Sequence, residues 1–313
     1  MEEKRKVVLV GTGFVGTSFA YALLNQGGVN ELILIDVNKE KAEGEALDLA
    51  HGLAYAPSRM EIRAGDYTEC KDASIVVITA GIAQKPGQTR LELLQTNSNI
   101  VKSITKEVMA SGFNGIFVIA SNPVDIMTYI VQKESKMPTN RVIGSGTMLD
   151  TARLRYILGE KLDISPKNTH VYVMGEHGDS SFVPWNHCYI GCKKLLDIAR
   201  EKKQTLEDLD EIRKQVKDSA YEIIDKKKAT YYGIGVALTR LVKAILNDED
   251  SIMTVSTYLN GEYNEKDIYV GVPAIINRKG VREILELPFN KEEQDKLSNS
   301  CNILRKTFEE LGR

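Results

Sequence analysis

The sequence predicts an α/β fold in which a doubly wound parallel sheet is followed by an α+β domain. Four short apolar runs, at residues 7–10, 32–35, 75–79 and 116–119, are typical of parallel strands that helices cover on both faces. Segments with helical spacing lie between these runs, and strands that alternate with helices form a parallel sheet. Beyond about residue 146 this alternation gives way to charged helices and a β-rich stretch, which indicates a second domain.

Length and composition exclude several classes of protein. The chain has 313 residues, enough for one large domain or two closely joined ones. A formal net charge of −2, with Lys and Glu mixed along the chain, leaves no basic face for nucleic acid. No run is apolar and long enough to span a bilayer, and the first strand begins almost at Met1, so we expect a cytoplasmic protein with no membrane partner.

The cysteines do not indicate a metal site or a disulfide framework. They have neither CxxC nor metal-ligand spacing, and four cysteines in a chain of this size are most simply free thiols in a reducing compartment. We therefore expect no bound metal. The four positions are Cys70, Cys188, Cys192 and Cys301.

A glycine-rich turn joins the first strand to the first helix. Gly11 permits a tight turn, Gly13 lets backbone N–H groups approach a pyrophosphate, and Gly16 lets the helix pack closely on the strand. The second strand ends at Asp36, twenty residues after Gly16, where a carboxylate would bind ribose hydroxyls and repel a 2′-phosphate. These features predict a Rossmann domain that binds NAD in preference to NADP.

The next elements continue the alternation. Residues 38–53 have helical spacing, with Asn38 as the N-cap, and Lys41 in the first turns could reach the adenosine end of the cofactor. A short strand is expected near residues 61–63. The polar loop at residues 80–90 follows a strand at the sheet edge where ligands bind, and its length is typical of a lid.

The last part of the first domain contains a second polar turn. A helix is expected at residues 91–111, and the strand after it runs into the segment at residues 120–125. In that segment Pro123 fixes the turn and leaves Asn122 projecting at the same sheet edge. A helix and a short strand at residues 141–144 complete the expected domain.

We place the domain boundary at residue 146. Residues 1–146 form the expected NAD-binding domain, and residues 147–313 form the expected substrate-binding and catalytic domain. The second domain should contain a helix to about residue 158, a strand at 169–174, a charged helix at 205–228, an apolar helix after 235, a β-rich stretch at 268–276 and a charged helix at 291–312.

The polar residues of the chain supply the groups that hydride transfer to a 2-keto acid requires. His177 could protonate the ketone oxygen, with Asp150 as the carboxylate that stabilises its charged form. Arg153, one helical turn after Asp150, and Arg90, at the end of the loop, could bind the substrate. Taken singly, each of these residues has an ordinary structural explanation. His177 could be a loop histidine, Asp150 and Arg153 could form an ion pair within a helix, and Arg90 could be a surface charge.

Six segments resemble the lactate/malate dehydrogenase family in sequence and in order, and together they cover nearly the whole chain. Within that family the chain is similar to bacterial L-lactate dehydrogenases. The resemblance implies NAD-dependent reduction of pyruvate to L-lactate, reversibly, as the fermentative step after glycolysis. The segments are GTGFVG, AQKPGQTR, ASNPVD, LDTARLR, GEHGDS and ATYYGIG.

The same resemblance implies roles for individual residues. His177 would be the acid/base with Asp150 as its partner, Arg153 would bind the substrate carboxylate, and Arg90 would polarise the ketone. The residues expected to contact substrate are Gln84, Arg90, Asn122, Asp125, Asp150, Arg153 and Thr230, with Ile234 lining the pocket. Those expected to contact cofactor are Gly11, Gly13, Val15, Gly16, Asp36, Lys41, Tyr67, Gly81, Ile82, Ser103, Ala120, Asn122 and Ser145.

Gln84 favours pyruvate over oxaloacetate. In malate dehydrogenases an arginine is expected at this place in the loop, where it pairs with the second carboxylate of oxaloacetate. A neutral Gln84 would leave that carboxylate unpaired in a closed site, at a cost of about 2–5 kcal/mol. The pattern does not exclude bulkier 2-keto acids.

Arg155 and His170 indicate an effector site. Arg155 lies about 200° around its helix from Arg153, away from the substrate set. In the bacterial enzymes that this chain resembles, the corresponding Arg and His of two subunits bind fructose 1,6-bisphosphate across a two-fold axis. The resemblance therefore implies allosteric activation and a homotetramer, assembled without the N-terminal arm of vertebrate relatives. The alternative is a solvated arginine and a packed histidine.

Three other functions remain open from the sequence. A malate dehydrogenase is disfavoured by Gln84, and an NAD-dependent glycosidase would need a metal-binding Cys/His set. A nucleotide-binding structural or regulatory protein would have no need of His177, Arg153 and Arg90 in one pocket.

Overall fold

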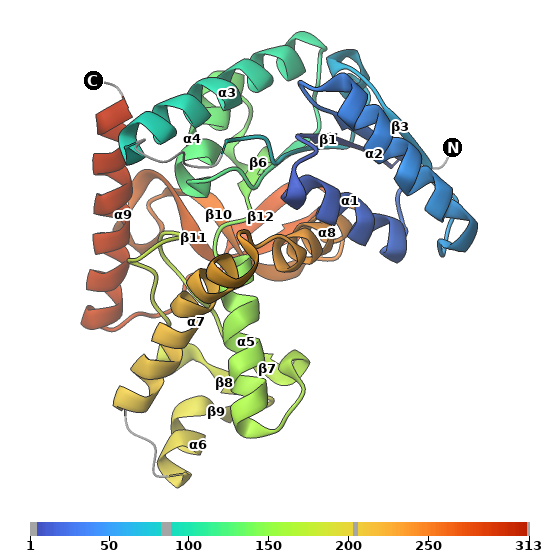
Figure 1. Ribbon diagram of the computed structural model, residues 1–313. Coiled ribbons are helices and arrows are strands. Elements are labelled where there is room, and N and C mark those ends of the chain that lie inside the picture. The colour runs from blue at the N-terminus through green and yellow to red at the C-terminus, as the bar shows by residue number, and fades with distance from the viewer. Residues whose placement is uncertain (1–4, 83–88, 203–205, 312–313) are drawn as a thin grey trace.

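A nine-stranded mixed sheet forms the centre of the molecule (Figure 1). The computed structural model describes residues 5–82, 89–202 and 206–311. The strand order is β12-β11-β10-β6-β5-β4-β1-β2-β3, parallel from β6 to β3 and antiparallel from β6 to β12. The strands are β1 (Lys6–Val10), β2 (Glu31–Ile35), β3 (Glu61–Ala64), β4 (Ile75–Ile78), β5 (Ile116–Ile119), β6 (Val142–Gly144), β10 (Ser251–Asn260), β11 (Lys266–Asn277) and β12 (Gly280–Ile284).

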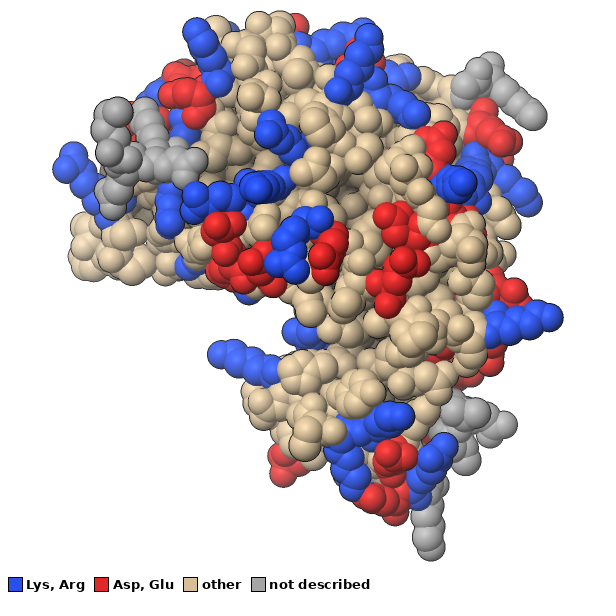
Figure 2. Space-filling model, turned by 180° about the vertical axis from the view of Figure 1, so that it is seen from behind, with Lys and Arg blue, Asp and Glu red and all other residues tan. Residues whose placement is uncertain are grey.

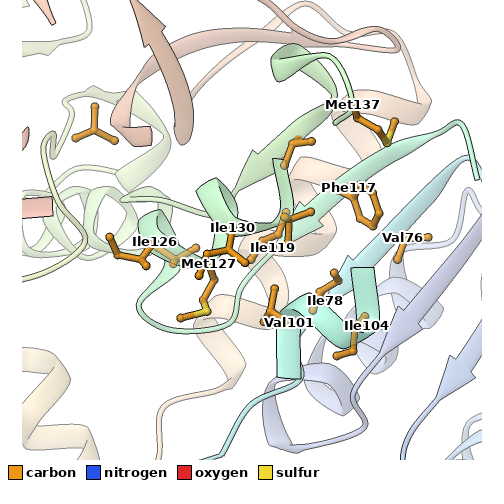
Figure 3. Close-up of a cluster of buried hydrophobic side chains, with 14 of the residues drawn as sticks. Val76, Ile78, Val101, Ile104, Phe117, Ile119, Ile126, Met127, Ile130 and Met137 are labelled. Carbon is orange, nitrogen blue, oxygen red and sulfur yellow. The ribbon is translucent and has the colours of Figure 1, made fainter. Parts of the chain in front are cut away.

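Helices cover both faces of this sheet, so the predicted Rossmann fold is confirmed. Alternate residues of each parallel strand point to opposite faces: Val8 packs on the α3 side, and Val7 packs on the α1 side. Figure 3 shows part of the apolar core on the α3 side of the sheet, where Ile78 and Ile119 lie near Val101. One face carries α1 (Phe14–Gln26), α2 (Lys39–His51) and α8 (Tyr232–Leu246); the other carries α3 (Arg90–Ala110), α4 (Val124–Ser135) and α9 (Lys291–Leu311).

The sheet continues across the expected domain boundary. β10 pairs with β6 where Ser256 lies opposite Gly144, and β11 and β12 extend the sheet from there. The β-rich stretch at residues 268–276 is part of β11, whereas the sequence pattern does not predict β10 or β12. β10 is difficult to recognise because its buried positions include Thr254, Ser256 and Thr257, so its pattern is not apolar.

A smaller body, with its own apolar core, extends below the sheet in Figure 1. Leu154 and Leu158 of one helix pack there against Val171 and Val173. The predicted strand at residues 169–174 is discontinuous, because its first two residues pair with residues 189–190 and Met174 pairs with Phe182 in an isolated bridge. The elements are α5 (Met148–Leu162), α6 (Leu195–Glu201), α7 (Leu206–Lys227), β7 (Thr169–His170), β8 (Tyr189–Ile190) and β9 (Lys193–Lys194). Of these, α6, β8 and β9 are not predicted by the sequence pattern.

Charges of both signs are mixed on the surface. Figure 2 shows Lys and Arg side chains interspersed with Asp and Glu side chains on the back of the molecule. Among the residues that the structure describes, no helix has the length and apolarity to cross a bilayer.

Candidate active site

The turn between β1 and α1 has the geometry that its glycines predict. Gly11 has a φ of +102°, and its N–H donates to the carbonyl oxygen of Ile35 at 2.8 Å. A Cβ on Gly11 would lie 2.7 Å from the backbone nitrogen of Ala80. A Cβ on Gly16 would collide with the carbonyl oxygen of Gly11. Gly11 therefore permits the turn, and Gly16 permits the close packing of α1 against it.

Gly13 lies beside open space at the start of α1. It is the N-cap of α1, and no side chain caps the helix there. A Cβ built on Gly13 meets no atom within 4 Å. The first N–H groups of a helix lack partners within the helix and attract anions. The turn therefore fits the pyrophosphate of a dinucleotide.

Asp36 is an ionised acceptor beside this turn. Its carboxylate accepts from the N–H and hydroxyl of Thr12, at 2.7 and 2.9 Å, and from the N–H of Asn38 at 3.0 Å. Partial burial alone would raise the pKa of Asp36, but these hydrogen bonds outweigh it and the pKa is lowered. Lys41 Nζ donates to the carbonyl oxygen of Thr12 at 2.6 Å. The arrangement fits a ribose better than a 2′-phosphate.

The other expected cofactor residues lie at several places around the carboxyl ends of the parallel strands. Ala120 and Ser145 directly follow β5 and β6, and Ser145 donates its N–H to Ile119 at 2.8 Å. Tyr67 is half-buried, and this burial raises its pKa to about 12. Val15 is in the first turn of α1, Gly81 and Ile82 are exposed beyond β4, and Ser103 is exposed in the middle of α3. No described hydrogen bond of its side chain joins Ser103 to the turn.

Asn97 was not identified from the sequence. Its side chain on α3 is buried, and its Oδ1 accepts from the N–H of Ile82 at 2.9 Å. Its Nδ2 donates to the carbonyl oxygens of Ile82 and Asn122, at 3.4 and 3.3 Å. Asn97 therefore connects the start of the loop to the Asn122 turn. A single polar residue in a helix gives no sequence signal for this role.

The structure brings together the predicted proton-transfer group and carboxylate-binding arginine. Asp150 Oδ2 lies 2.6 Å from His177 Nδ1, and Asp150 Oδ1 accepts from Arg153 Nη1 at 3.0 Å. Asp150 and Arg153 lie one turn apart at the start of α5. His177 is in the loop that follows Met174. The Asp150 and Arg153 side chains are only 13% and 11% exposed, so their charges act in a site with little water.

The Asp150 carboxylate keeps His177 protonated to higher pH. Burial alone would lower the pKa of His177, but the charge and hydrogen bond of Asp150 outweigh it and the pKa is raised. Burial also opposes ionisation of Asp150, whose pKa is nevertheless lowered by His177 and Arg153. Because Nδ1 contacts Asp150, Nε2 is the nitrogen available to a substrate.

Asp125 lies behind the histidine. It is 2% exposed, and its oxygens accept from the backbone N–H of His177 at 2.9 Å and from Ser256 Oγ at 2.6 Å. Burial raises the pKa of Asp125 to about 6. Both oxygens already bond to the protein, so this placement suits a residue that positions His177 better than the expected substrate contact.

The segment just before α8, which is expected to border the substrate, contacts the glycine turn through two aromatic rings. Phe14, in the turn, stacks on Tyr231 with ring centroids 5.1 Å apart. Thr230 is half-buried just before α8, and Ile234 is in the first turn of α8. Asn122 is exposed beyond β5. Gln84 and the side chain of Arg90 lie outside the described residues.

Arg155 and His170 lie away from this site, on the smaller body. Arg155 is half-buried, its Nε has no hydrogen-bond partner among the described residues, and burial lowers its pKa. Tyr172 is close enough to Arg155 to act on its pKa in the opposite direction. His170 is exposed on β7, on the face opposite Val171, as the alternation predicts.

Comparison with known proteins identifies the family. Residues 5–144 match the family model described as lactate/malate dehydrogenase, NAD binding domain, and residues 147–312 match lactate/malate dehydrogenase, alpha/beta C-terminal domain. The chain belongs to the lactate/malate dehydrogenase family. As a member of the lactate/malate dehydrogenase family it is an NAD-dependent oxidoreductase, which confirms the predicted enzyme class and cofactor.

Relatives within the family are similar over their full length. The chain is 56% identical to L-lactate dehydrogenase 2 of Bacillus anthracis over 304 residues, 97% of both chains. A lactate dehydrogenase from a Medee basin deep-sea metagenome has a TM-score of 0.97 at 52% identity, covering 99% of this chain and 100% of that one. The ligands-bound form of the minor L-lactate dehydrogenase of Enterococcus mundtii has a TM-score of 0.97 at 53% identity, covering 98% of both chains. Its ligands-unbound form has a TM-score of 0.92 at 51% identity, covering 99% of this chain and 98% of that one.

Proposed function

We propose that this chain is an L-lactate dehydrogenase that interconverts pyruvate and L-lactate. The observation that carries the proposal is the Arg153–Asp150–His177 arrangement, with contacts of 3.0 and 2.6 Å, in a chain whose glycine turn fits NAD. The L-lactate dehydrogenases that it resembles over their full length support the same substrate. Residues 1–146 bind NAD in this proposal, and residues 147–313 supply the acid/base and the carboxylate clamp.

The proposed mechanism assigns binding and proton transfer to separate side chains. Arg153 binds the pyruvate carboxylate with the N–H groups that do not contact Asp150. His177 donates the proton on Nε2 to the ketone oxygen, and it accepts a proton there when lactate is oxidised. Asp150 stabilises the imidazolium and fixes the ring, so that the proton is on the correct nitrogen. NADH, when bound, supplies the hydride.

The remaining residues position these groups. Asp125 holds the backbone of His177, and Asn97 holds the loop against the Asn122 turn. Asn122 and Arg90 interact with the ketone oxygen in this proposal, and Thr230 borders the substrate. The cofactor contacts are those expected from the resemblance, around the Gly11–Gly16 turn and Asp36.

Gln84 selects pyruvate over oxaloacetate in this proposal. The test is NADH oxidation by the purified protein with each keto acid in parallel. We expect a kcat/KM for pyruvate at least about tenfold above that for oxaloacetate, and Gln84→Arg should reverse the preference. Equal or greater turnover of oxaloacetate by the unsubstituted protein would instead favour malate dehydrogenase.

Arg155 and His170 form the effector site in this proposal. Two copies of each across a two-fold axis would surround the phosphates of fructose 1,6-bisphosphate with cationic side chains. The half-buried guanidinium of Arg155, with no described partner on Nε, is the observation that favours this assignment. We place the enzyme in the cytoplasm, as a homotetramer that completes fermentation after glycolysis.

Two other functions have less support. An NAD-dependent glycosidase would need a cluster of metal ligands, and among the described residues no group of three or more His, Cys, Asp or Glu could hold a metal ion. A non-catalytic nucleotide-binding protein would bind NADH but turn over neither keto acid. That outcome would overturn the proposed activity and leave the fold and family unaffected.

A further inference from the structure

A cavity opens at the opposite edge of the sheet from the candidate active site. Its volume is about 960 Å³, within the size range of small-molecule sites. Its lining includes Arg5, Asn30, Ser74 and Arg141, each of which directly precedes a parallel strand. The cavity therefore lies at the amino ends of the strands, whereas the glycine turn and Asp36 lie at the carboxyl ends.

The lining of this cavity is strongly cationic. The overall charge of the chain is −2, so the local charge does not follow from composition. Among the described residues that line it, Asp72 is the one acidic residue, and it accepts a hydrogen bond from Lys6 at 2.6 Å. The cationic lining residues are Arg5, Arg59, Lys71, Arg141, Arg278 and Lys279.

Ordinary structural roles account for three of these cations. Arg5 donates to the carbonyl oxygen of Gly28 at 3.3 Å, just beyond the end of α1, and Arg141 donates to that of Asn114 at 3.2 Å, beyond α3. Arg278 pairs with Asp248 at 3.0 Å.

The other three cations have no such explanation. Arg59, Lys71 and Lys279 are exposed, and none of them forms an ion pair with a carboxylate in the described part of the chain. They come from three separate segments, before β3, before β4 and in the β11–β12 turn. Cations that line one cavity make its electrostatic potential positive, which favours an anion there.

We propose that this cavity binds an oligophosphate, the shared chemistry of inorganic tripolyphosphate and of nucleoside triphosphates. Several phosphate groups in one ligand would satisfy cations that are spread around the rim. Arg59 can bind a phosphate with two parallel N–H groups, and Lys71 and Lys279 can bind as point charges. The amides of Asn30 and Asn114 also line the cavity and can donate to phosphate oxygens.

The test is calorimetric titration of the full-length protein with inorganic tripolyphosphate. Saturating NADH and fructose 1,6-bisphosphate are present, so that the cofactor site and the proposed effector site are occupied. We expect one site per chain, weakened at high salt, and a loss of affinity of about tenfold or more in Arg59→Ala/Lys71→Ala/Lys279→Ala.

The matched control removes three exposed lysines elsewhere. Lys266→Ala/Lys291→Ala/Lys306→Ala changes the net charge equally and should retain the affinity of the unsubstituted protein. No binding of tripolyphosphate, or an equal loss in both triple variants, would overturn the proposal. ATP and adenosine titrations then distinguish the source of the anion: ATP binding that exceeds tripolyphosphate binding assigns a nucleotide, and equal binding assigns the phosphate chain alone.

Discussion

Two carboxylates support the same histidine in different ways. Asp150 contacts the ring of His177, and Asp125 accepts from its backbone N–H. Burial opposes ionisation of both carboxylates, but the cations beside Asp150 lower its pKa, whereas burial raises the pKa of Asp125 to about 6. Chemically identical side chains are thus set to different tasks by their neighbours.

Asp150→Asn should move the pH dependence of pyruvate reduction. In the proposed mechanism pyruvate reduction needs protonated His177, so its rate should fall as pH rises through the raised pKa of His177. Without the carboxylate that pKa is lower, and we expect the fall at lower pH, with kcat/KM at pH 7 reduced by about 10²–10⁴. The measurement is the pH profile of kcat/KM. Asp125→Asn, which removes a carboxylate that does not touch the ring, is the comparison; equal profiles in both variants would contradict the assignment.

Asp125 also makes stability depend on pH. Its pKa is raised in the folded state, so its contribution to stability is complete below the unfolded value near 4 and is lost as pH rises through about 6. Between pH 4 and pH 7 the unsubstituted protein should therefore lose about 3 kcal/mol of unfolding free energy that Asp125→Asn does not lose. The unfolding free energy of the variant minus that of the unsubstituted protein should increase by this amount. Denaturant titrations at fixed protein concentration measure this difference. The exposed Asp295→Asn should show no such trend, and a flat difference for Asp125→Asn would refute the argument.

At the scale of elements, two glycines of the same turn meet different requirements, one of backbone packing and one of open space. Gly16 is required because a Cβ there would strike the backbone of Gly11. Gly13 has open space beside it, so packing does not require a glycine there, and we expect its role to concern the cofactor.

Alanine at these two glycines should therefore give opposite results. We expect Gly16→Ala to lower the free energy of unfolding by about 1–3 kcal/mol, because backbone atoms must move. Gly13→Ala should cost less than about 1 kcal/mol in stability and weaken NADH binding about tenfold or more, since the methyl group enters the space that fits the pyrophosphate. Thermal unfolding and NADH fluorescence titration measure the two effects. Tight NADH binding by Gly13→Ala would contradict this placement of the cofactor.

Elements with strong local signals could be predicted, and those defined by tertiary contacts could not. Asn38 caps α2 by accepting from Lys41 N–H at 3.1 Å, as its sequence position predicts. Thr89 and Glu92 form a capping box that begins α3 one residue before the expected start. β8 and β9 have two residues each and exist only through their pairing. Asn97 likewise acquires its role from Ile82 and Asn122, far from it in sequence.

At the scale of the whole molecule, the site is assembled from segments that are distant in sequence. Asp36, Asn122 and Asp150 follow different strands of one sheet, and the Phe14–Tyr231 stack joins the glycine turn to the segment just before α8. Arg155 is two residues after Arg153 on α5, yet it faces the smaller body, where no described carboxylate pairs with it. A change at Arg155 can therefore reach Arg153 through one helix.

Fructose 1,6-bisphosphate should consequently change both assembly and substrate binding. An anion between two copies of Arg155 would stabilise the interface that brings them together, so we expect a larger tetramer fraction and a pyruvate half-saturation about fivefold lower or more. Sedimentation velocity and initial rates, with and without the bisphosphate, measure these effects. Arg155→Gln should lose both responses, whereas Lys161→Gln, at an exposed position on the same helix, should keep them. If Arg155→Gln responded as the unsubstituted protein does, the bisphosphate would bind elsewhere, and the half-buried guanidinium would need another explanation.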